Sequence, residues 1–263
     1  MKKTISIFCL FVVLLFPSFA GAQAVTFDLQ RGLETAFWKA FSEPEEFKAC
    51  EIFQLLGYNT AEISMIGKIT PRPSKIIVEA EACEIPADFR NIKVICTNVL
   101  YYNLTIERVV FDFPDCRIDL DELKNGRLRF LAGDRINVKT EVSQRDILKV
   151  FDLFAKASAL SRLRLKLDDE VASLKGRVKK GVFVVEFNLK GSTQLVDPKK
   201  VVFRCDRLLL NGSPMPRNAV NSIFSRINPV FDATKTWLNL NIASINIKSG
   251  FVETIATIER KKG

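Results

Sequence analysis

The feature that most constrains the fold is a series of segments between Arg135 and Glu259 in which apolar and polar residues alternate. In Arg162–Leu167 three basic residues alternate with three leucines, and the same period recurs from Phe183 to Lys190. Side chains of a strand point to opposite faces with period two, so each segment must bury one face. Such faces either cover a packed core or line a cavity that holds an apolar ligand.

The beginning of the chain has the pattern of a secretory signal. Two lysines precede an apolar stretch from Ile5 to Phe19, and small residues at Ala22 and Ala24 offer cleavage sites. The stretch is shorter than the roughly 20 apolar residues of a bilayer span, and an uncleaved signal anchor is the alternative. We therefore expect residues 1–22 to be a signal peptide. The protein is then exported, to the periplasm or to the outer face of the inner membrane.

The chain is basic, with a formal net charge of +9, which becomes +7 without the two lysines of the signal. This charge favours peripheral contact with anionic surfaces such as phospholipid headgroups, and it also serves solubility. No basic cluster alternates with aromatic residues as in a nucleic-acid groove, so we expect no nucleic-acid partner.

Cysteines are too few and too widely spaced for a metal or redox motif. No C-x-x-C spacing occurs, which argues against zinc and thioredoxin-like chemistry. An odd number of thiols in an oxidising compartment allows at most two disulfide bonds, and Cys83 with Cys96 is the preferred pair. The cysteines that follow the signal are Cys50, Cys83, Cys96, Cys116 and Cys205.

A helical segment, residues 23–57, precedes the strands. Its first helix has an apolar stripe from Phe27 to Phe41. A capping box at Ser42–Glu45 predicts the start of a second helix, which Gly57 ends. We expect this segment to pack on the body of the protein. Lying on a membrane is the alternative, which its many acidic residues disfavour.

Residues 58–263 are expected to form one α+β domain, in which a long twisted antiparallel sheet wraps around amphipathic helices. Residues 114–126 offer the best internal boundary, but we expect one continuous sheet. The two helices are expected at Ser143–Ala157, capped by Ser143, and at Pro216–Asn228. A slip of parity at Ala243–Ser244 predicts a bulge. The predicted strands are Glu62–Thr70, Lys75–Cys83, Lys93–Thr97, Leu104–Phe113, Arg135–Val142, Arg162–Leu167, Val171–Val178, Val182–Leu189, Lys199–Leu210, Leu238–Ile247 and Phe251–Ile258.

The sequence contains no sign of an active site or cofactor. It has no histidine, which excludes Ser-His-Asp and Cys-His catalysis and most catalytic zinc sites. Two acidic clusters, Asp119–Glu122 and Asp168–Glu170, could hold calcium or act as a carboxylate pair. Both stand at strand ends, where solvated turns collect aspartates, and we expect them to be turns.

Phenylalanine is abundant, with 21 residues against three tyrosines and two tryptophans. Because its ring has no polar group, it suits a dry core or a surface that contacts acyl chains. Basic residues such as Arg162, Arg164, Lys199 and Lys200 either meet a lipid phosphate at the rim or form the solvated face of their strands. The residues expected to line a lipid site are Phe151, Phe154, Phe183, Phe187, Val220 and Phe224.

Four stretches between Lys93 and Glu259 have a recognisable order of strands, turns and helix starts. They are Phe111–Phe113 with Cys116–Leu123, Val138–Leu148, Leu208–Pro216 and Leu240–Val252. This order resembles the LmeA-like phospholipid-binding family of exported bacterial proteins. The resemblance implies an elongated sheet wrapped around helices, similar to tubular lipid-binding folds, and binding of a phospholipid or a related lipid outside the cytoplasm. It transfers no individual ligand-binding residue.

Three hypotheses follow. The first is a non-enzymatic periplasmic protein that binds phospholipid or another acyl lipid between sheet and helices, for envelope lipid handling. The second is a structural or interaction module of the envelope, with a filled core and a protein partner. The third is an enzyme that uses Asp119 or Asp168, which the missing histidine disfavours. The oligomeric state stays open.

Overall fold

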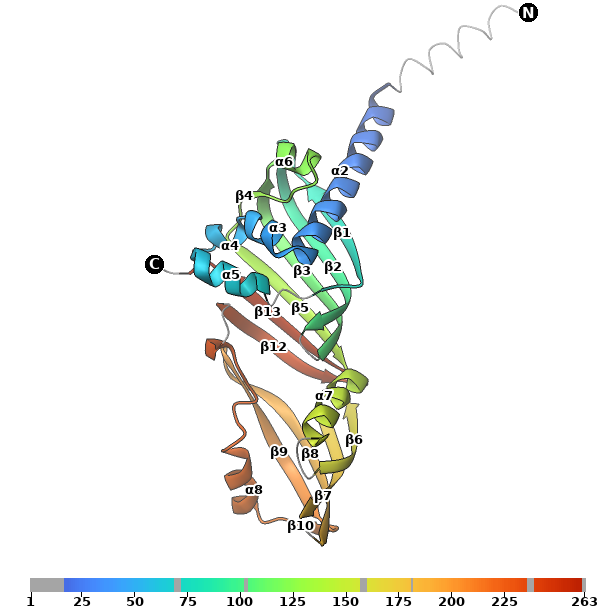
Figure 1. Ribbon diagram of the computed structural model, residues 1–263, viewed down its shortest axis with the longest axis vertical. Helices are drawn as coiled ribbons and strands as arrows, with labels where there is room; N and C mark the ends of the chain where they lie inside the picture. The colour runs from blue at the N-terminus through green and yellow to red at the C-terminus, as the bar shows by residue number, and fades with distance from the viewer. Residues whose placement is uncertain are drawn as a thin grey trace, which may run out of the picture.

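The computed structural model describes residues 17–68, 72–101, 104–156, 160–180, 182–235 and 239–261. Two antiparallel sheets follow one another along the long axis of the molecule (Figure 1). The fold is α+β with mostly antiparallel sheets, as predicted. The expectation of one continuous sheet is wrong, because strands 75–143 and 240–259 pair among themselves while strands 160–214 form a second sheet.

The first sheet is curled like a half-barrel and has the order β1-β2-β3-β5-β13-β12, with β4 paired to β3. The predicted bulge is confirmed by a register shift in β12 between Ile242 and Ser244. The strands are β1 (Lys75–Ala82), β2 (Asp88–Tyr101), β3 (Leu104–Ile118), β4 (Phe130–Ala132), β5 (Arg135–Ser143), β12 (Leu240–Lys248) and β13 (Phe251–Glu259).

Helices cover one face of this sheet and close a large apolar core. Phe37 of the first helix packs on Phe113 and Phe130, with ring centroids 5.6 and 6.3 Å away. All three rings are buried, so this half of the molecule has a filled interior. The helices are α2 (Pro17–Ser42), α3 (Pro44–Ala49), α4 (Ile52–Leu55), α5 (Thr60–Lys68) and α6 (Leu120–Lys124).

The predicted capping box at Ser42 is not formed. Ser42 is the last residue of α2, and the N-cap of α3 is Glu43, whose side chain makes no capping hydrogen bond. The predicted second helix is also interrupted, since Glu51 takes a left-handed conformation with φ of 59°. The break separates α3 from α4, and α4 contacts β4.

The segment from Glu62 to Thr70 was expected to be a strand, and it is helical as far as Lys68. Asn59 Oδ1 accepts a hydrogen bond from Glu62 N, and Glu62 Oε2 accepts one from Asn59 N, both of 3.0 Å. This reciprocal cap starts α5, and Ile63 and Ile66 are buried one helical turn apart. Residues 69 and 70 lie outside the described part.

Pro114 was expected to end a strand, yet β3 continues through it to Ile118. On one side Pro114 lies opposite Asn91 of β2. On the other side, β5 pairs with β3 only as far as Asp112, and the pairing of β3 with β4 starts at Arg117. No described strand pairs with Pro114 on this side, so its missing N–H breaks no sheet hydrogen bond there.

The second sheet has the order β10-β9-β8-β7-β6, with β11 paired to β9. Helix α7 joins it to the first sheet, and hydrogen bonds such as Ile242 N to Pro198 O, 2.7 Å, tie β12 to it. Its elements are α7 (Gln144–Lys156), β6 (Leu160–Asp168), β7 (Val171–Lys180), β8 (Phe183–Asp197), β9 (Lys200–Leu210), β10 (Ser213–Pro214), α8 (Arg217–Phe224), β11 (Phe231–Asp232) and the 3₁₀ helix η1 (Ala233–Lys235).

Candidate functional site

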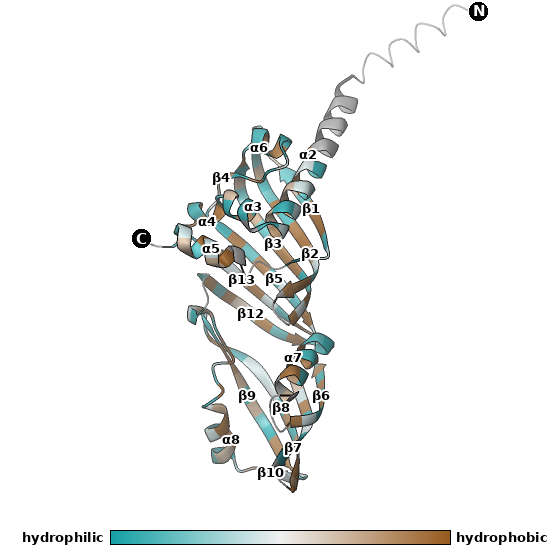
Figure 2. Ribbon diagram, viewed as in Figure 1, coloured by the Kyte–Doolittle hydropathy of each residue, from teal (hydrophilic) through white to brown (hydrophobic). Residues whose placement is uncertain are grey.

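The second sheet has one apolar and one polar face, and Figure 2 shows the alternation along its strands. The strand register aligns residues of the same face across four strands. One row of the apolar face consists of Leu165, Leu174, Leu189 and Leu208. The neighbouring row points to the opposite face and consists of Arg164, Lys175, Asn188 and Leu209.

Helix α7 covers the β6 side of the apolar face. Its residues Ile147, Leu148 and Phe151 pack against the buried Leu165 and Leu167. The helix crosses from the end of the first sheet onto the second (Figure 1), so it also joins the two sheets through its apolar side.

The start of α7 is fixed by the predicted cap. Ser143 Oγ accepts a hydrogen bond from Asp146 N, 3.2 Å, and donates one to Asp146 Oδ2, 2.7 Å. Lys149 Nζ contacts the other carboxylate oxygen at 2.7 Å. Burial of Asp146 raises its pKa, but the hydrogen bonds from Lys149 and Ser143 outweigh this and hold the pKa below its usual value.

Helix α8 covers the β9 side. The ring of Phe224 lies 5.7 Å from that of Phe203, and Val220 is buried. After the helix, the amide of Asn228 accepts a hydrogen bond from Phe203 N, 2.9 Å, and donates one to Phe203 O, 3.0 Å. The end of α8 is thereby attached to the strand that it covers.

Between the two helices, the apolar face over β7 and β8 is covered only in part (Figure 1). Among the residues described for this sheet, the buried hydrophobic side chains are Leu165, Leu167, Val201 and Leu208. The middle of the face is half-buried and consists of Leu163, Val178, Val185, Phe187, Leu189 and Leu210. This half-open strip is a continuous apolar surface of partly exposed side chains.

Two glycines let side chains lie directly on the sheet. A Cβ at Gly176 would stand 2.6 Å from Leu163 and 2.7 Å from Phe187. A Cβ at Gly191 would stand 2.7 Å from the ring of Phe203. A larger residue at either position would push these side chains away from the sheet. The two glycines therefore let the side chains of the strip lie close to the backbone.

The structure brings most of the predicted lipid-binding residues to this side of the sheet. Val220 is 7% exposed and belongs to the packing of α8, whereas Phe183 is 75% exposed at the start of β8. The side chain of Phe154 lies outside the described part. The residues on this side are Phe151, Phe183, Phe187, Val220 and Phe224.

Of the two positions considered for the basic residues, Arg162 and Arg164 take the solvated face of their strand and not the rim of the apolar strip. Arg162 and Arg164 line a pocket on the polar face, together with Lys175 and Arg177, which the sequence reasoning missed. The alternation of Val171–Lys180 puts Lys175 and Arg177 on one face of their strand, and the strand register puts that face beside Arg164. Lys199 Nζ instead donates to Asn239 Oδ1, 2.8 Å, and serves the packing of a loop.

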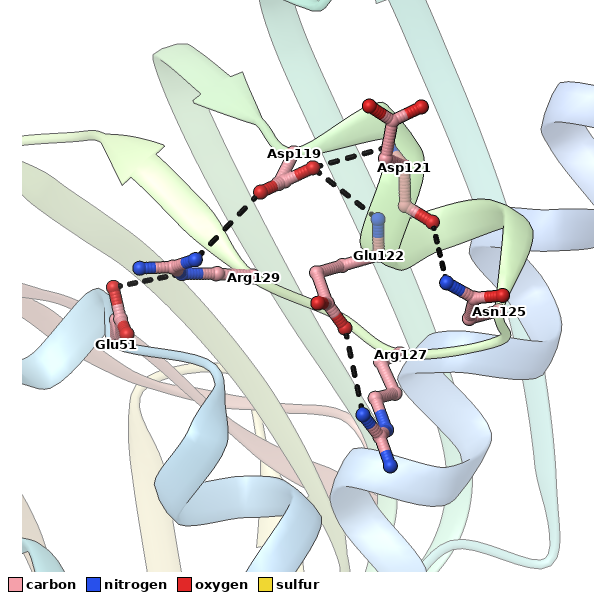
Figure 3. Close-up of polar contacts among 7 residues, drawn as sticks. All are labelled: Glu51, Asp119, Asp121, Glu122, Asn125, Arg127 and Arg129. Atoms are coloured by element: carbon pink, nitrogen blue, oxygen red, sulfur yellow. Dashed lines mark hydrogen bonds and ion pairs between the residues drawn. The ribbon is translucent and has the colours of Figure 1, made fainter.

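The first acidic cluster caps a helix (Figure 3). Asp119 Oδ1 accepts hydrogen bonds from Asp121 N, 3.0 Å, and Glu122 N, 3.2 Å, at the start of α6. Arg129 lies 3.7 Å from Asp119 Oδ2 and 3.1 Å from Glu51. The cluster was expected to be a turn, and it is instead the N-terminus of a short helix, where backbone donors and an arginine contact the carboxylate of Asp119.

The second acidic cluster closes the β6–β7 hairpin. Asp168 pairs with Lys166 at 2.6 Å, and Asp169 Oδ1 accepts a hydrogen bond from Ser249 N at 3.1 Å. Glu170 has a φ of 65°, as the tight turn requires. These residues hold the second sheet against the β12–β13 turn, which is a structural role.

All five described cysteines are free thiols in the structure. Cys83 follows β1 and is exposed, whereas Cys96 is buried in β2. Burial raises the pKa of Cys50, Cys96 and Cys116 to about 12. The predicted pairing of Cys83 with Cys96 is not formed in this structure, because Cys83 follows Ala82, which lies opposite Phe89, whereas Cys96 lies opposite Ile76 near the other end of the hairpin.

No family model, curated protein or solved structure matches this chain. Within the described residues, no helix has the length and apolar character needed to cross a bilayer.

Proposed function

We propose that this protein is a non-enzymatic, exported binder of phospholipid or a related acyl lipid, acting in envelope lipid handling. The acyl chain lies on the apolar face of the second sheet, between α7 and α8. The observation that carries this proposal is the half-open strip around Phe187 and Leu189, in a molecule whose other half has a filled core. The resemblance to tubular lipid-binding folds belongs to the same proposal.

The energetics favour an acyl chain as occupant. Each CH₂ group removed from water contributes about 0.8 kcal/mol, so six groups laid along the strip contribute about 5 kcal/mol. Leu163, Leu189 and Leu210 would become fully buried by the same contact. A polar ligand would gain little there, since this face of β7 and β8 presents leucine, valine and phenylalanine.

Native mass spectrometry with lipid extraction, on protein purified from its own envelope fraction, tests the proposal. We expect phospholipid at a defined stoichiometry. A bare polypeptide mass, together with failure to take up lipid in a vesicle transfer assay, would refute it.

Substitution Leu189→Gln tests the location of the lipid. We expect affinity for lipid to fall about 10- to 100-fold, because an amide held against an acyl chain without a partner costs about 1–3 kcal/mol. Val196→Gln is the matched control, since Val196 lies on the same strand and is 62% exposed. Equal loss in both variants would contradict the assigned face.

The alternative is an interaction module of the envelope with a protein partner. The packed core around Phe37, Phe113 and Phe130 favours it for the first half of the molecule. Co-purification of one protein at fixed stoichiometry, with no extractable lipid, would support this alternative.

A further inference from the structure

The polar face of the second sheet carries a basic pocket of about 420 Å³. Two successive rows of side chains on this polar face form it. Arg164 of β6 lies directly opposite Lys175 of β7, and Lys175 lies opposite Asn188 of β8. In the next row, Arg177 lies opposite Glu186. Arg162 adds a further cation from a bulge in β6, where its φ is 53°.

The positive charge of this basic pocket is not balanced by protein. Its lining holds four cationic side chains and one carboxylate, and Glu186 is already paired with Arg177 at 2.5 Å. Within the described residues, no carboxylate pairs with Arg162, Arg164 or Lys175. Like charges directly opposite one another destabilise a sheet, so an external anion would stabilise this arrangement.

The arginine side chains indicate which class of anion the basic pocket would bind. A guanidinium presents a rigid fork of N–H donors that matches phosphate and carboxylate oxygens. The excess of three positive charges favours a group that carries phosphate. The volume of about 420 Å³ leaves room for a substituent on that phosphate.

An exposed apolar segment borders the basic pocket. Val182, Phe183 and Val184 are 90, 75 and 50% exposed, where β8 begins at the far end of the molecule from α2 (Figure 1). Val184 is two residues from Glu186, which is roughly 7 Å along a strand. This separation matches the thickness of about 5–7 Å of one headgroup layer of a bilayer.

We propose that this end of the second sheet docks on a bilayer that contains anionic phospholipid. Val182, Phe183 and Val184 enter the headgroup–acyl boundary, and a lipid phosphate occupies the basic pocket. This docking adds a membrane contact to the proposed function. It rests on that function only for what happens to the lipid after docking. The far end of the apolar strip then opens at the membrane surface, where an acyl chain can enter it.

Vesicle flotation of the protein without its signal segment tests the proposal. The probes are vesicles of phosphatidylcholine alone and vesicles with 30% phosphatidylglycerol. We expect binding only to the anionic vesicles, weakening as salt is raised. Arg164→Gln with Lys175→Gln should lower affinity roughly 30-fold, because each basic residue near an anionic surface contributes about fivefold.

The matched control is Arg31→Gln with Lys75→Gln, which removes two exposed cations from the other half of the molecule. Val182→Ser with Phe183→Ser removes the apolar contact and keeps the charge, and we expect at least a tenfold loss. Circular dichroism and thermal melting establish that each variant is folded. If the variant with Arg164→Gln and Lys175→Gln retains extractable lipid, its weaker vesicle binding reflects lost docking and not lost lipid binding on the apolar face.

Three results would overturn the proposal. One is equal binding to neutral and anionic vesicles. Another is an equal loss in the control pair, which would mean general attraction to a basic protein. The third is binding of glycerol phosphate or inorganic phosphate, measured by calorimetry, with no vesicle binding, since the basic pocket would then serve a soluble anion.

Discussion

Burial divides the five described cysteines into two chemical kinds. Cys50, Cys96 and Cys116 lie in the core of the first half, and their pKa of about 12 leaves roughly one thiolate in ten thousand at pH 8. Cys83 is exposed, and Cys205 is intermediate with a pKa raised by partial burial.

Alkylation of native protein at pH 8 should therefore modify Cys83 first, Cys205 more slowly, and the three core thiols only after unfolding. Peptide mass spectrometry at timed intervals measures this order. Cys83→Ser should abolish the fast phase. Labelling of Cys83 that requires prior reduction would instead establish a disulfide bond in the purified protein, and equal labelling of Cys96 would contradict the burial argument.

Two places in the chain separate what could be predicted from the sequence from what could not. The pair Asn59 and Glu62 has the spacing of a reciprocal cap, and Ile63 and Ile66 have helical spacing, so α5 was predictable from four residues. The lack of a partner among the described strands on one side of Pro114 was not predictable. It depends on where the pairing of β3 with β5 stops and where its pairing with β4 starts.

Helix α7 is the element that positions the proposed site. Its cap holds Asp146 with its side chain 1% exposed, and its apolar residues cover the β6 side of the strip. The negative charge at its first turn also meets the positive end of the helix dipole. The sequence predicted this helix and its cap correctly, because both depend on neighbours within four residues.

Asp146→Asn should destabilise the folded protein by about 1–2 kcal/mol at pH 7, since it removes a charged cap. The native pKa is below the unfolded value of about 3.9, so the ionised carboxylate contributes stability above that pH and loses its contribution as pH falls through the native pKa. Urea unfolding at pH 7 and pH 3 measures the difference, which should shrink at pH 3.

Asp152→Asn is the control for this helix, because Asp152 is exposed on α7. It should change stability by less than about 0.5 kcal/mol at either pH. An Asp146→Asn penalty of equal size at both pH values would mean that packing, and not the charged cap, is lost.

The whole molecule combines two halves of unequal packing. The first sheet and its helices share one continuous core, whereas the second sheet has a thin core and a half-open apolar face. Local stability follows buried apolar contact, so the second half should open more readily when its face is empty.

Hydrogen exchange with and without bound lipid tests this difference. At a free lipid concentration 100 times the dissociation constant, binding contributes about 2.7 kcal/mol, so amides of β7 and β8 should exchange up to about 100-fold more slowly. Amides of β2 and β3, which lie over the filled core, should be unchanged. Uniform slowing in both sheets would place the lipid outside the second sheet.

The sequence by itself determined which residues alternate, where α7 and α8 begin, and where β12 bulges, because each depends on neighbours a few residues apart. Only the tertiary structure decided that the strands divide into two sheets. It also decided that Arg164 and Lys175 meet on the polar face, and that β3 passes through Pro114. These outcomes depend on pairing between distant strands, which is selected by the total burial and hydrogen bonding of the chain.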